Sequence, residues 1–292
     1  MDLKDERGMP MLIRGATVWN CPGTMYDQKQ MEVDFKSLTQ AGIYANAALE
    51  TACELNRLGF TGASWHGFVF DKLNDREGEE LARFLRNTGT YLTVHHILPN
   101  PADEAQCIAF RPALERMLQW HKQYGLLKGL TFDTWYERKS LLPYLELALR
   151  IFRGQGIFLC CEDFPLNATE FEIVRPILTP DDDFGILMDV GHMNLRQTHA
   201  GLVADEDFIR AFEALPVPVR EVHLHDNRGE TDDHMYMGYG TLPLKSVVKG
   251  LKSIGFNGVV SVEIIWRQWK REEGFAFTKQ TSDAFFNLWE KA

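Results

Sequence analysis

The sequence predicts an α/β protein with the (β/α)8 TIM barrel fold, a parallel eight-stranded barrel with outer helices. Short runs rich in β-branched and aromatic residues alternate with longer amphipathic segments along the 292 residues, and this alternation is typical of parallel sheets. A chain of this length holds roughly eight strand–helix units, the number that closes such a barrel. A doubly wound open sheet is the alternative, but the glycine-rich phosphate turn that it ordinarily carries (GxGxxG or GxxxxGK[ST]) does not occur in the sequence.

The predicted strands are short apolar runs that end at polar residues or turns. In chain order they cover residues 11–19, 60–67, 91–98, 129–135, 156–164, 184–192, 220–227 and 258–265. Helices are predicted between them, over residues 43–58, 74–88, 114–124, 138–153, 200–214, 244–254 and 275–290. Val247, Val248 and Leu251, for example, keep the helical spacing of three and four residues. Gly255 follows them, where a glycine is expected after a helix.

No linker, proline-rich hinge or charge block divides the chain, so we expect one domain over residues 1–292, with an irregular segment over about residues 1–10. That segment, "MDLKDERGMP", lacks the basic and then apolar order of a secretory signal. The longest apolar stretches are too short to cross a bilayer. Five cysteines without a CxxC spacing favour a reducing compartment. We therefore expect a cytoplasmic protein without a membrane partner, and homo-oligomer formation is left open.

The net charge of −10 offers no basic field for phosphate backbones. It disfavours a nucleic-acid partner only mildly, because local patches and metal ions can supply positive charge. A small-molecule substrate is the better expectation.

Polar side chains end the last four predicted strands, where (β/α)8 barrels place their active sites. These residues are Glu162, Asp189, His223 and Glu263, separated by intervals of about one strand–helix unit. Alternation along the strands turns all four towards the barrel axis, because their aliphatic neighbours suit the helix layer. A single acid at a strand end is usually a helix cap or an ion-pair partner, but four groups of the same parity favour a common site.

Carboxylates that converge in this way would repel one another and raise their own pKa values. A divalent cation removes that conflict. Two Glu, one Asp and one His form a ligand set that suits Mn²⁺, Zn²⁺, Co²⁺ or Mg²⁺. The sequence thus predicts a metal site at the barrel mouth.

The segments "CEDF", "MDVGH", "HLHDNRGETDDH" with the following "GYG", and "VEI" resemble the strand ends of the xylose isomerase-like TIM barrels. This superfamily of sugar (phosphate) isomerases and epimerases also includes the apurinic-site endonucleases (apurinic endonuclease family 2). The resemblance is strong over roughly residues 156–265 and weak before residue 90. It implies that Glu162, Asp189, His223 and Glu263 are metal ligands. It also implies that Glu162 and Glu263 exchange protons with the substrate carbon.

The same resemblance gives other residues two alternative roles. His192 matches a histidine that holds a substrate oxygen in the epimerases or a further metal in the endonucleases. Asp232 and His234 match the endonuclease Asp-x-His, while His66 and His95 fall where endonucleases carry metal-binding histidines. We take His95 rather than His96 as the inward residue of "TVHH", from the strand alternation.

Substrate contacts are predicted for a second set of residues at the strand ends. Arg228 is the nearest candidate for the substrate-binding arginine of the epimerases, whose usual position is Gly229 here. His225 faces inward beside His223, either as a substrate contact or as support for a ligand. Trp65 and Trp266 could form walls for a sugar face, with core packing as the alternative reading.

These features predict a divalent-metal-dependent isomerase or epimerase that moves a proton next to a carbonyl of a small polyhydroxylated substrate, such as a sugar, keto-acid or cyclitol. A multi-zinc apurinic-site endonuclease and a metal-dependent dehydratase or lyase on the same barrel are the alternatives. The non-enzymatic alternative is a sugar-binding or structural barrel whose site is vestigial.

Overall fold

The strands close into a barrel in which every neighbouring pair is parallel, in the order β1-β2-β3-β4-β5-β6-β7-β8. The computed structural model describes residues 12–18, 41–67, 70, 73–96, 104–133, 138–266 and 269–291. The predicted (β/α)8 fold is confirmed. The predicted irregular segment 1–10 lies outside the described residues, and the single domain over 1–292 stays a prediction.

Each strand is four to six residues long and overlaps a predicted run; β4 begins two residues and β7 one residue before the run predicted for it. The strands are β1 (Ile13–Thr17), β2 (Gly62–His66), β3 (Tyr91–His96), β4 (Leu127–Phe132), β5 (Phe158–Glu162), β6 (Phe184–Asp189), β7 (Val219–Leu224) and β8 (Val259–Val262).

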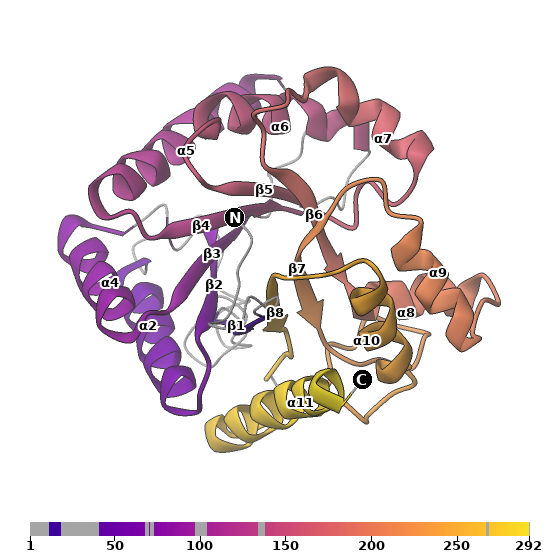
Figure 1. The fold of residues 1–292 in the computed structure, drawn as a ribbon. Coiled ribbons are helices and arrows are strands. Elements are labelled where there is room, and N and C mark those ends of the chain that lie inside the picture. Colours follow the sequence, from indigo (N-terminus) through magenta and orange to yellow (C-terminus); the bar gives the residue numbers. More distant parts are fainter. Residues whose placement is uncertain are drawn as a thin grey trace.

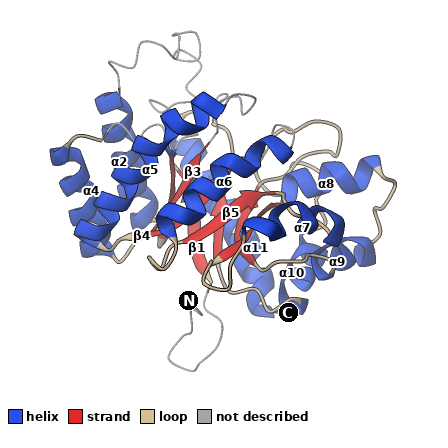
Figure 2. Ribbon diagram, turned by 90° about the horizontal axis from the view of Figure 1, so that it is seen from above, coloured by secondary structure: helices blue, strands red, loops and turns tan. Residues whose placement is uncertain are grey.

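Helices surround the strands in Figure 1, and in the view turned by 90° they flank the strands on both sides (Figure 2). They are α2 (Ala41–Arg57), α4 (Asp75–Thr88), α5 (Glu104–Tyr124), α6 (Arg138–Phe152), α7 (Ala168–Val174), α8 (Val190–His199), α9 (Asp205–Glu213), α10 (Leu244–Ser253) and α11 (Arg271–Lys291), with a short 3-10 turn at Arg175–Ile177. Among the described residues, no helix has both the length and the apolar character that a membrane span requires.

Local sequence explains where the helices begin and end. Asn74 and Glu77 form a capping box at the start of α4, and Gly89 ends that helix at φ 66°, which glycine adopts without strain. The aliphatic stripe of α10 is buried, as its spacing predicts.

The predicted strand 184–192 is too long by three residues, because α8 begins at Val190. The carboxylate of Asp189 accepts the backbone N–H of His192 at 2.8 Å and so caps α8 directly after β6. The predicted helix 200–214 is correspondingly shorter and forms α9. The short helix α7 was not predicted; Asn167 caps it.

The interior of the barrel holds a buried polar layer beside a small apolar cluster that includes Phe158 and Leu187. The outward residues of the strands pack with the helices into one large apolar core, whereas the inward Thr93, Glu221 and Ser261 are buried within the barrel. The carboxylate of Glu221 accepts hydrogen bonds from Ser261 Oγ at 2.7 Å and Thr93 Oγ1 at 3.2 Å. This polar interior lies beneath the strand ends where the candidate ligands were predicted.

Candidate metal centre and active site

Four buried side chains meet at the carboxyl ends of β5, β6, β7 and β8. Glu162 and Asp189 end β5 and β6, His223 lies in β7, and Glu263 follows β8. One ligand atom from each residue lies within 4.8 Å of those of the other three. The residues are 5%, 0%, 0% and 8% exposed, respectively. The structure thus brings together the four residues that the strand ends predicted, and their role as metal ligands stays a prediction. We call them the first group.

His223 and Glu263 are in direct contact within the first group. Nδ1 of His223 lies 2.8 Å from Oε2 of Glu263 and 4.0 Å from Oδ2 of Asp189. Burial by itself would lower the pKa of His223, but the Glu263 charge and hydrogen bond raise it to about 8. Burial would likewise raise the pKa of Glu263, but His223 and His234 hold it at about 2. The pair thus has the character of a buried ion pair.

Glu162 experiences the opposite effect. Burial raises its pKa well above the ordinary value, and the neighbouring charge of Asp133 adds to the shift. Glu162, Asp133 and His95 form a second group whose ligand atoms also lie within 4.8 Å of one another. Nε2 of His95 is 3.6 Å from Oε2 of Glu162. Asp133 was not among the predicted site residues, although it follows the last residue of β4 in the same way that Glu263 follows β8.

The loop after β7 completes a third group with α8. His192, His225, Asp232 and His234 place one ligand atom each within 4.8 Å of the others. The carboxylate of Asp232 lies between two histidines, with Oδ2 3.1 Å from Nε2 of His192 and 2.9 Å from Nε2 of His234. His225 and His234 stack with ring centroids 4.0 Å apart and planes 15° apart.

Asp189 joins the first and third groups. Its Oδ1 lies 2.9 Å from Nε2 of His225, while its Oδ2 lies 4.0 Å from Nδ1 of His223. Gly191 permits this approach, since a Cβ atom there would lie 1.9 Å from the His225 ring. Because Asp189 links the first and third groups and Glu162 belongs to both the first and the second, the three groups form one continuous cluster of acids and imidazoles.

The charges of the third group are strongly coupled. Burial opposes protonation of His192, but the charge of Asp189 and the hydrogen bonds to Asp163 and Asp232 raise its pKa far above the ordinary range. Burial also opposes protonation of His234, and its hydrogen bond to Asp232 raises the pKa to about 9. The pKa of Asp232 is lowered despite its burial, because both histidines donate to it.

The loop that carries Asp232 and His234 is held by its own side chains. Asp226 accepts the backbone N–H groups of Gly238, Gly240 and Leu242 at 3.0, 2.9 and 3.1 Å. The Asn227 amide donates to the carbonyl of Gly191 at 2.8 Å and so ties the loop to α8. These bonds anchor the loop and so hold the third group in place.

A family model described as the xylose isomerase-like TIM barrel matches residues 54–281, more than half of the chain. The chain belongs to this family. The match includes all three groups of clustered residues.

Solved structures of sugar epimerases share the fold. They include a D-tagatose 3-epimerase-like protein, with 17% identity, a TM-score of 0.63 and coverage of 97% of this chain and 99% of that chain. An L-ribulose 3-epimerase has 13% identity, a TM-score of 0.64 and coverage of 97% and 95%. The D-allulose 3-epimerase of Methylomonas sp., in complex with D-allulose, has 12% identity, a TM-score of 0.67 and coverage of 96% and 98%. At these identities the likeness shows the fold alone.

A curated relative covers a smaller part of the chain. The uncharacterized protein MJ1311 of Methanocaldococcus jannaschii is 34% identical over 92 residues. That stretch is 32% of this chain and 29% of the length of the relative.

The remaining histidines predicted as ligands lie on neighbouring strands. His95, not His96, faces the barrel axis, as the alternation predicts; His96 packs edge-on against Phe110 with ring centroids 4.8 Å apart. His66 pairs in register with His95 and is 1% exposed, but it belongs to none of the three groups.

The predicted substrate contacts outside the three groups lie in other surroundings. Trp65 and Trp266 are 1% and 3% exposed and belong to the apolar core, so neither has a face free for a sugar. The core-packing alternative applies to both. Arg228 is exposed, and its guanidinium lies 4.6 Å from the centre of the Tyr239 ring.

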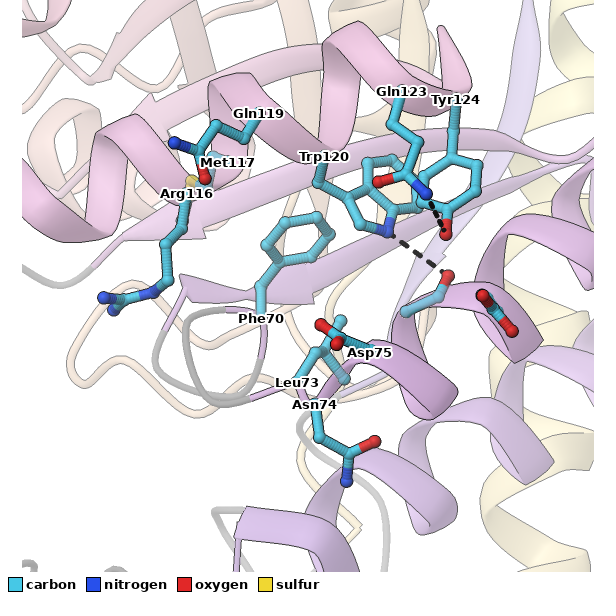
Figure 3. Close-up of a pocket in the computed structure, with 12 residues that line it drawn as sticks. Phe70, Leu73, Asn74, Asp75, Arg116, Met117, Gln119, Trp120, Gln123 and Tyr124 are labelled. Carbon is cyan, nitrogen blue, oxygen red and sulfur yellow. Dashed lines mark hydrogen bonds between the residues drawn. The ribbon is translucent and has the colours of Figure 1, made fainter.

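A cavity between α4 and α5 lies outside this cluster. Figure 3 shows Phe70, Trp120 and Tyr124 among its lining residues, with the Trp120 indole donating to the carbonyl of Gly78. None of the clustered acids and histidines lines it.

Proposed function

We propose that this protein is a divalent-metal-dependent isomerase or epimerase that transfers a proton next to the carbonyl of a small polyhydroxylated substrate, a sugar, keto-acid or cyclitol. The observation that carries the proposal is the first group, in which Glu162, Asp189, His223 and Glu263 converge from four neighbouring strands. Membership of the xylose isomerase-like family and the shared fold of the sugar 3-epimerases support it.

The donors of the first group fit a divalent cation. Three carboxylates and one imidazole suit Mn²⁺, Zn²⁺, Co²⁺ or Mg²⁺. The raised pKa of Glu162 reflects a buried carboxyl next to other acids, a conflict that positive charge would relieve. A cation held there would supply the positive charge that stabilises negative charge developing on substrate oxygens.

Glu162 and Glu263 would carry the proton. They reach the group from β5 and from the end of β8, and from these two strands they would approach a substrate carbon from different sides. One glutamate would remove the proton, and the other would return it on the opposite face or at the adjacent carbon. His192, half-buried at the start of α8, would hold a substrate oxygen.

Hydrogen exchange with solvent tests this chemistry directly. The Mn²⁺-loaded protein is incubated with a panel of ketopentoses and ketohexoses in D₂O, and NMR records deuterium at the carbon next to the carbonyl together with any new isomer. E162Q and E263Q should each lower turnover by roughly 10³-fold, because each removes a proton-transferring carboxylate. E146Q is the control, since Glu146 pairs with Arg150 on the exposed face of α6. Near-normal turnover in both active-site variants would refute the assignment.

The multi-ion endonuclease is the second candidate, and the second and third groups are the observation that favours it. They lie beside the first and offer more ligands than one ion needs. The net charge of −10 counts against binding to DNA. Metal analysis separates the candidates: one ion per chain supports the isomerase, whereas three ions with cleavage of an abasic duplex support the endonuclease. Loss of a hydroxyl group in the NMR assay would indicate the dehydratase or lyase alternative.

A further inference from the structure

Asp163 has an unusual backbone conformation next to the cluster. It follows Glu162 directly, has φ 51° and is 7% exposed. A residue other than glycine in this left-handed region costs about 1 kcal/mol or more, and it persists where its surroundings hold it. The contacts of its carboxylate identify what holds it.

Both carboxylate oxygens of Asp163 accept hydrogen bonds from β6 and α8. Oδ2 accepts from Nη1 of Arg196 at 2.7 Å and from Nδ1 of His192 at 3.0 Å. Oδ1 accepts from the backbone N–H of Asp189 at 3.2 Å and from Nη2 of Arg196 at 3.3 Å. One side chain therefore binds two members of the cluster, Asp189 through its backbone and His192 through its ring.

The contact with Asp163 determines how the His192 ring is presented. An ionised carboxylate can only accept, so Nδ1 of His192 carries a proton and donates it to Oδ2. The other ring nitrogen, Nε2, then faces the barrel mouth, 3.1 Å from Asp232. Hydrogen bonds of this kind to the second nitrogen fix the tautomer and orientation of histidines that bind metals or substrates.

Arg196 supplies the positive charge that a buried carboxylate needs. It lies four residues after His192, on the same face of α8, and its guanidinium contacts both oxygens of Asp163. One turn of α8 therefore presents both the histidine and the counter-charge of its partner.

We propose that Asp163 is a positioning residue that keeps a proton on Nδ1 of His192, so that Nε2, turned to the barrel mouth, is the nitrogen that releases its proton to a bound ion, and that Arg196 balances the charge of Asp163. The role of Asp163 deepens the proposed function. It rests on that function in one respect, namely that Nε2 of His192 would bind a substrate oxygen or an ion.

The test reads the His192 tautomer and the zinc affinity of substrate-free protein. Nitrogen-15 NMR of histidine-labelled protein with excess Zn²⁺ gives the tautomer, with His192 assigned from an H192Q spectrum. Competition with a chelating dye gives the affinity. D163G removes the carboxylate but suits the positive φ, whereas D163N keeps one acceptor oxygen and tolerates that backbone.

In the zinc-loaded wild type, we expect His192 to keep its proton on Nδ1 and to have none on Nε2. D163G should abolish this preference and lower the zinc affinity by about tenfold to a hundredfold. D163N should keep part of the preference for a proton on Nδ1. Its zinc affinity should fall by about tenfold, because the side chain loses its charge and one acceptor oxygen.

D182N is the matched control. Asp182 also accepts two hydrogen bonds from one arginine, Arg153, and one from a backbone N–H, that of Thr179, but it lies outside the cluster. It should leave both readings unchanged.

A wild-type tautomer and zinc affinity in D163G would overturn the proposal. If D163G does not fold, unchanged readings in D163N would do so instead. Neither reading needs a substrate, so failure of the proposed function, seen as absent hydrogen exchange in the wild type, is a separate outcome.

Discussion

Nδ1 of His223 lies 2.8 Å from Oε2 of Glu263 at the point where β7 and β8 reach the barrel mouth. Both atoms belong to the first group and both side chains are buried. Without a metal ion, a proton shared between these two atoms supplies the positive charge that a bound cation would otherwise supply. Protons and metal ions therefore compete for the same atoms.

Metal affinity should rise with pH because of this competition. The pKa of His223 is raised to about 8, so Nδ1 is protonated below that pH and must release its proton before it can bind a cation. We expect the affinity for Mn²⁺ to increase by up to about tenfold per pH unit between pH 6 and pH 8. Isothermal titration at pH 6, 7 and 8 measures it. An affinity that does not change over this range would contradict the ligand role of His223.

The metal-free protein should lose stability in alkaline solution. The folded-state pKa values of His223 and His234 are raised to about 8 and about 9. Groups with raised pKa values stabilise the fold fully below their unfolded pKa, and this stability is lost as pH rises through the folded value. The raised pKa of Glu162 acts in the same direction.

We therefore expect the free energy of unfolding to fall by on the order of 2 kcal/mol or more between pH 6 and pH 9. Urea denaturation with EDTA present measures this change. Protein loaded with metal serves as the comparison, because its ligands hold no proton to lose. Equal stability of the metal-free protein at the two pH values would show that the histidines are not paired with these acids.

Asp232 should control the protonation of His234. Its Oδ2 lies 2.9 Å from Nε2 of His234, and this hydrogen bond raises the histidine pKa. D232N removes the charge, so the pKa of His234 should fall from about 9 towards the ordinary value near 6.5. NMR titration of the ring C–H signals in metal-free protein reports it.

D233N is the control for D232N, because Asp233 bonds to Thr231 on the same loop. It should leave the titration of His234 in place. A His234 pKa that remains near 9 in D232N would assign the shift to Glu263 and Asp189 instead.

The members of the first group could be predicted because strand ends follow simple rules. Glu162, Asp189 and Glu263 each end or follow an apolar strand, and alternation determines which side of the barrel each one faces. The third group was less accessible to sequence reasoning. Its His192 lies on α8, but residues 190–192 were predicted as the end of a strand. The contacts of His192 depend on where that helix begins.

Asp163 and Arg196 had no distinct signal in the sequence, and Asp133 had only its place directly after an apolar strand. An acid next to a strand is common, and the left-handed backbone of Asp163 depends on donors from β6 and α8, which are distant in the chain. Trp65 and Trp266 show the reverse case. Their positions at strand ends suggested a sugar wall, but the helices packed against the barrel enclose them.

By itself the sequence determined the barrel, the direction in which each strand presents its residues, and the three acids and one imidazole that form the first group. Those features follow from local periodicity and from the rule that parallel strands end at the same face. Only the tertiary structure decided that Asp189 links two groups and that Asp163 and Arg196 hold His192. These contacts join residues 26 to 36 positions apart across β5, β6, β7 and α8, so hydrogen-bond geometry in the folded chain, not the pattern of neighbouring residues, sets them.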